Sequence, residues 1–178
     1  SSPRIGITTS QQSIPLLEIA LDSARESSNP LREAYALNDL AVAYKNLDDS
    51  HKAIEYYTKS LKVFSDINDE LSESYILSSL AETYLRISEY DDAISHAERS
   101  VEISIELSNS QAEANALGIL GSVYNRLGIY QKSLSFHSRE LEIVQRNNDA
   151  VGEANALGNL GETYFHLGDY SQSMSFLQ

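Results

Sequence analysis

The chain has 178 residues and a formal net charge of −13, from 26 acidic and 13 basic side chains, and it contains no cysteine. This charge argues against nucleic-acid binding, which needs a basic surface to neutralise phosphates, and against docking on anionic lipid. Without cysteine there is neither a disulfide framework nor a thiolate metal site, and no apolar run reaches the roughly 18 residues of a membrane span. We therefore expect a cytoplasmic protein without nucleic-acid binding or membrane insertion.

The first part of the chain carries no repeat of its own. Residues 1–13 are polar and without periodicity, which predicts a flexible tail. Between Ile14 and Ala24 apolar residues recur at helical spacing, so we expect a lone helix within residues 14–30. Its apolar positions are in register with the second helix of the repeats that follow.

From residue 31 onward the sequence repeats with a period of 40 residues. Two leucines and a tyrosine mark each copy: Leu37, Leu77, Leu117 and Leu157; Leu40, Leu80, Leu120 and Leu160; Tyr44, Tyr84, Tyr124 and Tyr164. A fixed period in this range is typical of solenoids, in which stacked units share a continuous core. The expected units are repeat 1 (31–70), repeat 2 (71–110), repeat 3 (111–150) and a truncated repeat 4 (151–178).

Each repeat carries the signals of two helices joined by a short turn, and no segment alternates as a strand would. Polar residues before the first helices predict N-caps, at Asn29, Asp69, Asn109 and Asp149. Glycines suit the left-handed residue that ends a helix, at Gly128 and Gly168. The second helices are expected to begin near Ser50, Tyr90, Tyr130 and Tyr170.

These motifs resemble the tetratricopeptide repeat (TPR). In repeat 4 the matching residues are Leu160, Gly161, Tyr164, Tyr170 and Ser173. The sequence departs from the usual pattern in two ways. It has leucine at the family's early tryptophan position, and its period is longer than the commoner one of about 34 residues. In both features it resembles the long-helix branch of the family. That branch includes kinesin light chains, Pins-type adaptors and bacterial signalling proteins. The resemblance implies an all-α fold, a right-handed superhelical solenoid of antiparallel helix pairs.

Two further positions in the first helices point to tight packing. Gly121 and Gly161 stand where repeats 1 and 2 have Ala41 and Ala81. A glycine inside a helix costs about 1 kcal/mol relative to alanine, so its presence predicts close approach of a neighbouring helix. The tyrosines four residues after Leu40 and its equivalents share the leucines' face, and we expect them in the core.

No arrangement of residues predicts catalysis. The four histidines, His51, His96, His137 and His166, include no pair three or four residues apart, so no helical metal pair exists. The acidic doublets are adjacent residues, which do not share a helix face. We expect no enzyme activity, no bound metal and no cofactor.

What remains is a binding surface. The resemblance implies that the first helices line a concave face, which mixes amide, aromatic and charged side chains suited to a peptide main chain. The residues expected to contact a partner are Tyr75, Arg86, Asn115, Asn125, Arg126, Asn155, Phe165 and His166.

Two functions are compatible with this sequence. The first is a protein-interaction module that holds a peptide or protein segment in the concave groove. The second is a sensory or regulatory segment of a bacterial signalling protein, such as a diguanylate cyclase or kinase, acting through dimerisation or a change of curvature. Apolar residues near the C-terminal end, among them Met174 and Phe176, also suggest a homodimer formed through that end.

Overall fold

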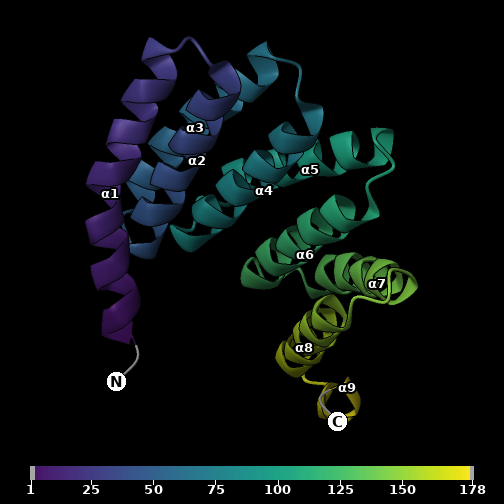
Figure 1. Cartoon of the computed structure of the whole chain (residues 1–178). Helices are drawn as coiled ribbons and strands as arrows, with labels where there is room; N and C mark the ends of the chain where they lie inside the picture. Colours follow the sequence, from purple (N-terminus) through teal and green to yellow (C-terminus); the bar gives the residue numbers. More distant parts are fainter. Residues whose placement is uncertain (1–2, 177–178) are drawn as a thin grey trace. The chain divides into compact units, whose positions relative to one another are not determined.

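Short turns join a succession of helices in the computed structural model, which describes residues 3–176. Over these residues there are nine α-helices and no strand (Figure 1). The helices are α1 (Pro3–Glu26), α2 (Pro30–Asn46), α3 (Ser50–Asp66), α4 (Glu70–Arg86), α5 (Tyr90–Glu106), α6 (Ser110–Arg126), α7 (Tyr130–Arg146), α8 (Ala150–Leu167) and α9 (Tyr170–Phe176). The predicted all-α class of repeated helix pairs is confirmed.

The turns share one backbone geometry. One residue of each turn has a positive φ: Ser28, Asp48, Asn68, Ser88, Ser108, Gly128, Asn148 and Gly168. After α2, for example, the N–H of Asp48 donates to the Lys45 carbonyl (3.1 Å) and that of Asp49 to the Tyr44 carbonyl (3.0 Å). This is the Schellman arrangement, in which a left-handed residue lets the chain satisfy the last carbonyls of the helix. The predicted roles of Gly128 and Gly168 are confirmed.

The next residue of the turn begins the following helix. The side chain of Asn29 accepts from the Arg32 N–H, and that of Asp149 from the Gly152 N–H. Asp69 and Asn109 cap α4 and α6 in the same way. The four predicted N-caps are therefore confirmed. Before α7 the cap position holds Ile129, which has no side-chain acceptor.

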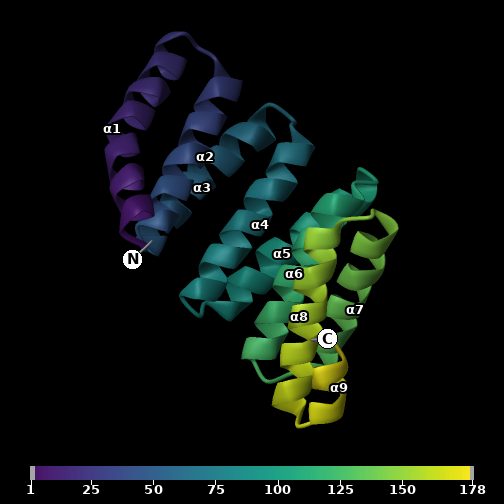
Figure 2. The same ribbon diagram turned by 60° about the horizontal axis from the view of Figure 1, so that its bottom comes forward.

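The chain divides into two compact units: unit 1 spans residues 1–89 and unit 2 spans residues 90–178. In unit 1, α1 to α4 pack in chain order, each against the next (Figure 2). Its main core joins α2, α3 and α4 through Ala41, Tyr57, Phe64 and Leu80. A second cluster, around Leu21 and residues of α2, holds α1 in place.

Unit 2 contains α5 to α9, again packed in chain order. Leu117 of α6, Ile143 and Val144 of α7 and Ala156 of α8 form its buried apolar cluster. The equivalent leucines at positions 40, 80, 120 and 160 are at most 2% exposed in the two units. These four leucines are therefore core residues, as predicted, and at the other leucine position of the repeat Leu37, Leu77 and Leu117 are buried while Leu157 is half-buried.

The tyrosines of the repeat are less buried than predicted. Tyr124 is buried, but Tyr44 and Tyr164 are only half-buried. Each of these two stacks face to face on a ring of the following helix, Tyr44 on Tyr56 at 5.4 Å and Tyr164 on Phe176 at 5.5 Å between centroids. A half-buried tyrosine can contribute packing and still leave part of its surface in contact with water.

The beginning of the chain differs from the expected tail. Helix α1 starts at Pro3 and not at Ile14, so residues 3–13 are helical. Polar side chains do not stop a helix by themselves: Pro3 lies in the first turn, where its missing N–H is not needed, and the Thr, Ser and Gln residues that follow tolerate helix. Residues 1–2 of the expected tail, and residues 177–178 of the truncated repeat, lie outside the described part of the chain. The repeat boundaries themselves stay a prediction.

Candidate functional site

A pocket of about 460 Å³ opens on unit 1, lined mainly by α2 and α4; we call it the unit 1 pocket. Its lining consists of Tyr35, Asn38, Val42, Phe64, Leu71, Ser72, Tyr75, Ile76 and Ser79. Tyr35 and Tyr75 are 49% and 42% exposed, and the edge of Tyr35 packs on the buried ring of Phe64 at 5.3 Å. The predicted contact residue Tyr75 therefore lies in an aromatic, partly apolar hollow that is open to solvent.

Arg86, also predicted to contact a partner, is engaged inside unit 1. Its guanidinium forms an ion pair with Asp48 and donates to the Lys45 carbonyl at 3.3 Å. Lys45 in turn pairs with Glu82 at 2.9 Å. These contacts join the C-terminal ends of α2 and α4, so the Arg86 side chain already has two acceptors within its unit.

A buried hydroxyl lies close to the unit 1 pocket. Tyr57 is fully buried and its hydroxyl forms no hydrogen bond with the described residues, although Ser79 of the pocket lining is a neighbour. The Ser79 hydroxyl donates instead to the Tyr75 carbonyl at 3.1 Å. Burial raises the pKa of Tyr57 above its ordinary value, partly opposed by Lys45. The ring of Tyr57 therefore contributes packing, and its hydroxyl group has no hydrogen-bond partner among the described residues.

Unit 2 has a smaller pocket of about 190 Å³, the unit 2 pocket, lined by α6, α7 and the start of α8. Its lining consists of Gln111, Ala114, Asn115, Glu140, Val144, Asp149, Val151, Gly152 and Asn155. The structure thus brings two predicted contact residues, Asn115 and Asn155, to one hollow. Both are exposed, and no hydrogen bond within the described residues engages either side chain.

The two pockets occupy the same register of the repeat. Tyr35 and Asn115 are two repeat lengths apart, and so are Tyr75 and Asn155. The same spacing relates the remaining shared positions: Phe64 and Val144, Leu71 and Val151, Ser72 and Gly152. The same positions of the repeat therefore line a pocket in each unit. The pocket is aromatic in unit 1 and is lined by amides and carboxylates in unit 2.

Four further predicted residues lie outside these two pockets. Asn125 is half-buried, and its side-chain oxygen is buried without a hydrogen-bond partner among the described residues. Arg126 is exposed at the end of α6. Phe165 and His166 touch each other and belong to an exposed aromatic group at the end of α8, in which Phe165 also contacts Tyr170 at 5.4 Å. Whether any of them meets a partner stays a prediction.

A buried polar pair in unit 2 was not anticipated from sequence. His137 is 1% exposed and its Nδ1 lies 2.9 Å from Glu140 Oε2. The imidazole donates, because a carboxylate has no hydrogen to give. Room for both side chains comes from α6: a Cβ on Gly118 would lie 2.7 Å from Glu140 Oε1, and one on Gly121 would touch the imidazole.

The described residues lack two other kinds of site. Residues 3–176 contain no helix that is both long and apolar enough to cross a membrane. The same part of the chain has no group of three or more His, Asp or Glu side chains placed to hold a metal ion.

Comparison with known proteins gives matches of fold and of family. BtubC (BKLC) from P. vanneervenii aligns with a TM-score of 0.75 at 16% identity, over 99% of this chain and 89% of that chain. A protein described as a kinesin light chain with nearly identical TPR-like repeats, from Podosopora anserina, aligns with a TM-score of 0.76 at 17% identity, over 98% and 88%. The apo form of RapI aligns with a TM-score of 0.83 at 18% identity, over 95% of this chain and 47% of that chain. Among curated protein sequences no match was found.

The packed helix pairs with a pocket at a fixed register define a helical repeat protein, and these solved structures share its fold. The tetratricopeptide repeat profile matches residues 32–106, 72–137 and 112–178. The chain belongs to the tetratricopeptide repeat family. Proteins with this fold are generally interaction scaffolds and not enzymes.

Proposed function

We propose that this chain is a protein-interaction module that binds partner polypeptide in the pocket of each unit. The observation that carries the proposal is the equivalence of the pockets. The same register position is hollow and open to solvent in each unit, although most of the side chains around it differ.

The unit 1 pocket suits an apolar or aromatic anchor. Four of its lining residues are large and exposed: Tyr35, Val42, Leu71 and Tyr75. Aromatic residues around a concave site are the ones that most often dominate binding energy, because they bury a large area at a low cost in conformational entropy.

The unit 2 pocket suits the main chain of a partner polypeptide. Asn115 and Asn155 each offer an N–H donor and a carbonyl acceptor, which match the alternating groups of a peptide backbone. A solved structure of a Rap protein in complex with Competence and Sporulation Factor has this fold, with a TM-score of 0.76 at 19% identity over 88% of this chain and 44% of that one. Another protein with this fold therefore forms a complex with a binding partner.

The test is a selection of short random peptides, about a dozen residues long, displayed on phage and panned on the full chain. Selected peptides are then titrated by fluorescence anisotropy against Tyr75→Ala, Asn155→Ala and a matched control, Tyr170→Ala. Tyr170 is 61% exposed and lies outside both pockets. We expect the two pocket variants to weaken binding by about tenfold or more, since each removes an anchor, and the control to leave it unchanged.

Two results would refute the proposal. One is the absence of any enriched peptide. The other is a set of peptides that bind both pocket variants as tightly as they bind the wild type.

The signalling alternative from the sequence, regulation of an attached output domain by dimerisation or a change of curvature, stays a prediction. Self-association through the C-terminal end also stays a prediction; Met174 is 62% exposed there, whereas Phe176 is covered by Tyr164. Sedimentation of the chain over a concentration range tests self-association and the dimerisation route of the signalling alternative, and a strictly monomeric chain would count against these two.

A further inference from the structure

We propose that the unit 2 pocket is a subsite for a basic side chain, lysine or arginine, of the bound partner segment. This inference rests on the proposed function and specifies the chemistry of one of its two pockets.

The first reason is the charge of the lining. Glu140 and Asp149 both contribute carboxyl groups, and none of the residues that line this pocket is basic. The remaining polar groups are neutral amides of Gln111, Asn115 and Asn155. The whole chain carries a net charge of −13, which favours the approach of a cationic segment over long range.

The second reason is the position of Glu140. This residue is only 7% exposed, yet it lines the pocket. One carboxylate oxygen, Oε2, accepts from His137 at 2.9 Å, while no hydrogen bond within the described residues engages Oε1. Oε1 can therefore accept from a cationic donor that enters the pocket, where the attraction is stronger than at a fully exposed carboxylate.

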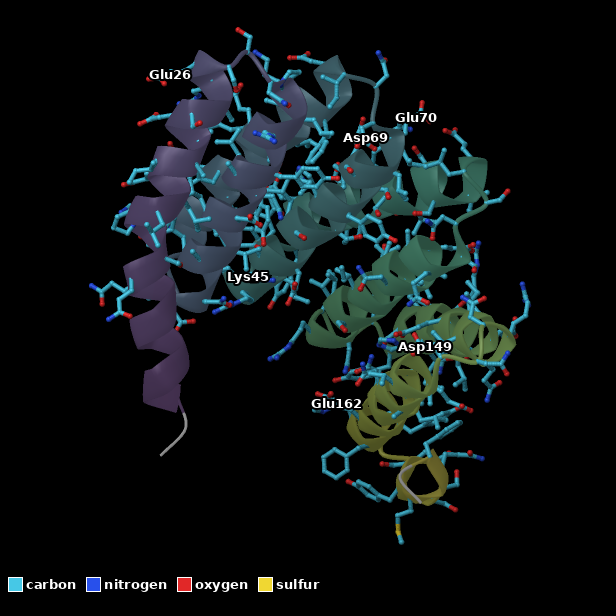
Figure 3. All side chains as sticks on the ribbon, in the orientation of Figure 1. Glu26, Lys45, Asp69, Glu70, Asp149 and Glu162 are labelled. Carbon is cyan, nitrogen blue, oxygen red and sulfur yellow. The ribbon has the colours of Figure 1, made fainter. Side chains whose placement is uncertain are left out.

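The third reason is the state of Asp149, at the turn between α7 and α8 (Figure 3). Its Oδ1 accepts from the Gly152 N–H at 2.9 Å and its Oδ2 from the Gln111 side chain at 3.2 Å. These bonds hold the pKa of Asp149 below its ordinary value. Both donors are neutral, so the hydrogen bonds orient the carboxylate and leave its charge in place.

The equivalent pocket of unit 1 shows that this chemistry is not a general property of the repeat. At the position of Glu140, unit 1 has Ser60, whose hydroxyl donates to the Ala34 carbonyl at 2.8 Å. Tyr35 and Tyr75 replace Asn115 and Asn155. The carboxylate pair belongs to unit 2, so the two pockets select different side chains.

A basic side chain fits the pocket better than a metal ion or an anion does. A metal site needs more ligands than two carboxylates, one of them already bound to an imidazole, and the described residues contain no such group. An anion would meet two negative charges. A lysine or arginine side chain is long enough to reach Glu140 from an exposed backbone and carries three to five donors for oxygens of this kind.

The experiment uses the peptides selected on the full chain. Their lysine and arginine content is compared with that of the unselected library. Each basic residue of a selected peptide is then replaced, arginine by citrulline and lysine by norleucine, and affinities are measured for the wild type and for Glu140→Gln. Glutamine keeps the size of the side chain and an acceptor for His137, and it removes the charge.

We expect loss of the positive charge to weaken binding to the wild type by about tenfold and to have little effect on Glu140→Gln, since the interaction is then already absent. Glu142→Gln, an exposed carboxylate on the same helix outside the pocket, is the matched control and should behave as the wild type. The preference for a basic residue should also fall as the salt concentration rises.

Asn115→Lys provides a second variant that does not depend on a buried position. Asn115 is exposed, so the substitution leaves the core intact, and the new positive charge should repel basic peptides while Asn115→Gln should not. Two results would refute the subsite without refuting the interaction module. One is a set of binding peptides with no preference for basic residues. The other is an effect of the peptide's positive charge that persists in both Glu140→Gln and Asn115→Lys. Failure to select any peptide would refute both the subsite and the interaction module.

Discussion

His137 lies directly against Gly121, where a Cβ atom would come 2.5 Å from Cε1 of the imidazole. One turn earlier on α6, Gly118 makes the same room for Glu140. Two glycines three residues apart on α6 thus receive a histidine and a glutamate three residues apart on α7. The sequence predicts a close neighbour at Gly121, and the neighbour is a pair of polar side chains that hydrogen-bond to each other.

Gly121→Ala should therefore destabilise the protein in spite of the better helix propensity of alanine. The three imidazole atoms nearest the new methyl group would lie within 2.7 Å, and the buried ring has little room to move. We expect the free energy of unfolding to fall by about 1–3 kcal/mol, measured by urea denaturation. Unchanged stability would show that His137 moves aside without cost.

Gly158→Ala is the matched control on α8. Apart from the chain neighbours and the backbone of α8 itself, no described atom lies within 4 Å of a Cβ at this position, and the residue is inside a helix. The substitution should stabilise the protein by up to about 1 kcal/mol through helix propensity alone. If both alanines destabilise, steric contact with His137 is not the cause of the first effect.

Ile129→Asp should stabilise the protein. Ile129 precedes α7 with φ −92° and ψ 62°, close to the backbone geometry of Asp49 and Asp69, but it offers no acceptor to the first turn. It is also 45% exposed, so little packing is lost. We expect a gain of about 1 kcal/mol in urea denaturation, and none from Ile129→Ala. Equal effects of the two substitutions would mean that the cap bond does not form.

Leu120→Ala tests the register of the repeat. Leu120 is 2% exposed in the core of unit 2, so truncation should leave a cavity and lower the free energy of unfolding by about 2–5 kcal/mol. A change below about 0.5 kcal/mol is what an exposed position would give, and it would contradict the assignment.

The contribution of Asp149 to stability should depend on pH. Its folded-state pKa lies below the unfolded value of about 3.9, because the Gly152 N–H and the Gln111 amide bind the charged form. As pH falls, the unfolded chain takes up the proton first, so the stabilisation is present above that value and is lost below it. Asp149→Asn keeps a cap acceptor that does not titrate. The difference in unfolding free energy between wild type and Asp149→Asn should therefore change in acid and stay constant near neutral pH.

Much of the helical framework could be predicted because it depends on local chemistry. Asn29 and Asp149 are caps by their residue type and their place before an apolar period, and Gly168 is a helix end because it tolerates positive φ. Residues 3–13 show the limit of this reasoning. Their lack of an apolar period describes what they can bury, but not whether their backbone is helical.

The candidate site was predictable only in part, because its character depends on residues of other helices. Asn115 and Asn155 follow from the repeat register, but Glu140 enters their pocket only because Gly118 leaves space on another helix. Arg86 has the position of a partner contact, and the nearby Asp48 and Lys45 use its donors inside the unit. Such competition between neighbours is set in three dimensions and leaves no period in the sequence.

The turns impose a strict rule on chain length. Asp49 closes α2 through its N–H to the Tyr44 carbonyl and opens α3 through its carboxylate, which accepts from the Lys52 N–H. Because one residue serves both helices, deleting or inserting a single amino acid there removes the hydrogen bond that ends α2 and the one that caps α3. Excision or duplication of a full 40-residue segment between equivalent turns instead rejoins matching ends. Arrays built from this chain should therefore grow or shrink by whole repeats, and a recombinant with one internal copy added should fold with its turns unchanged.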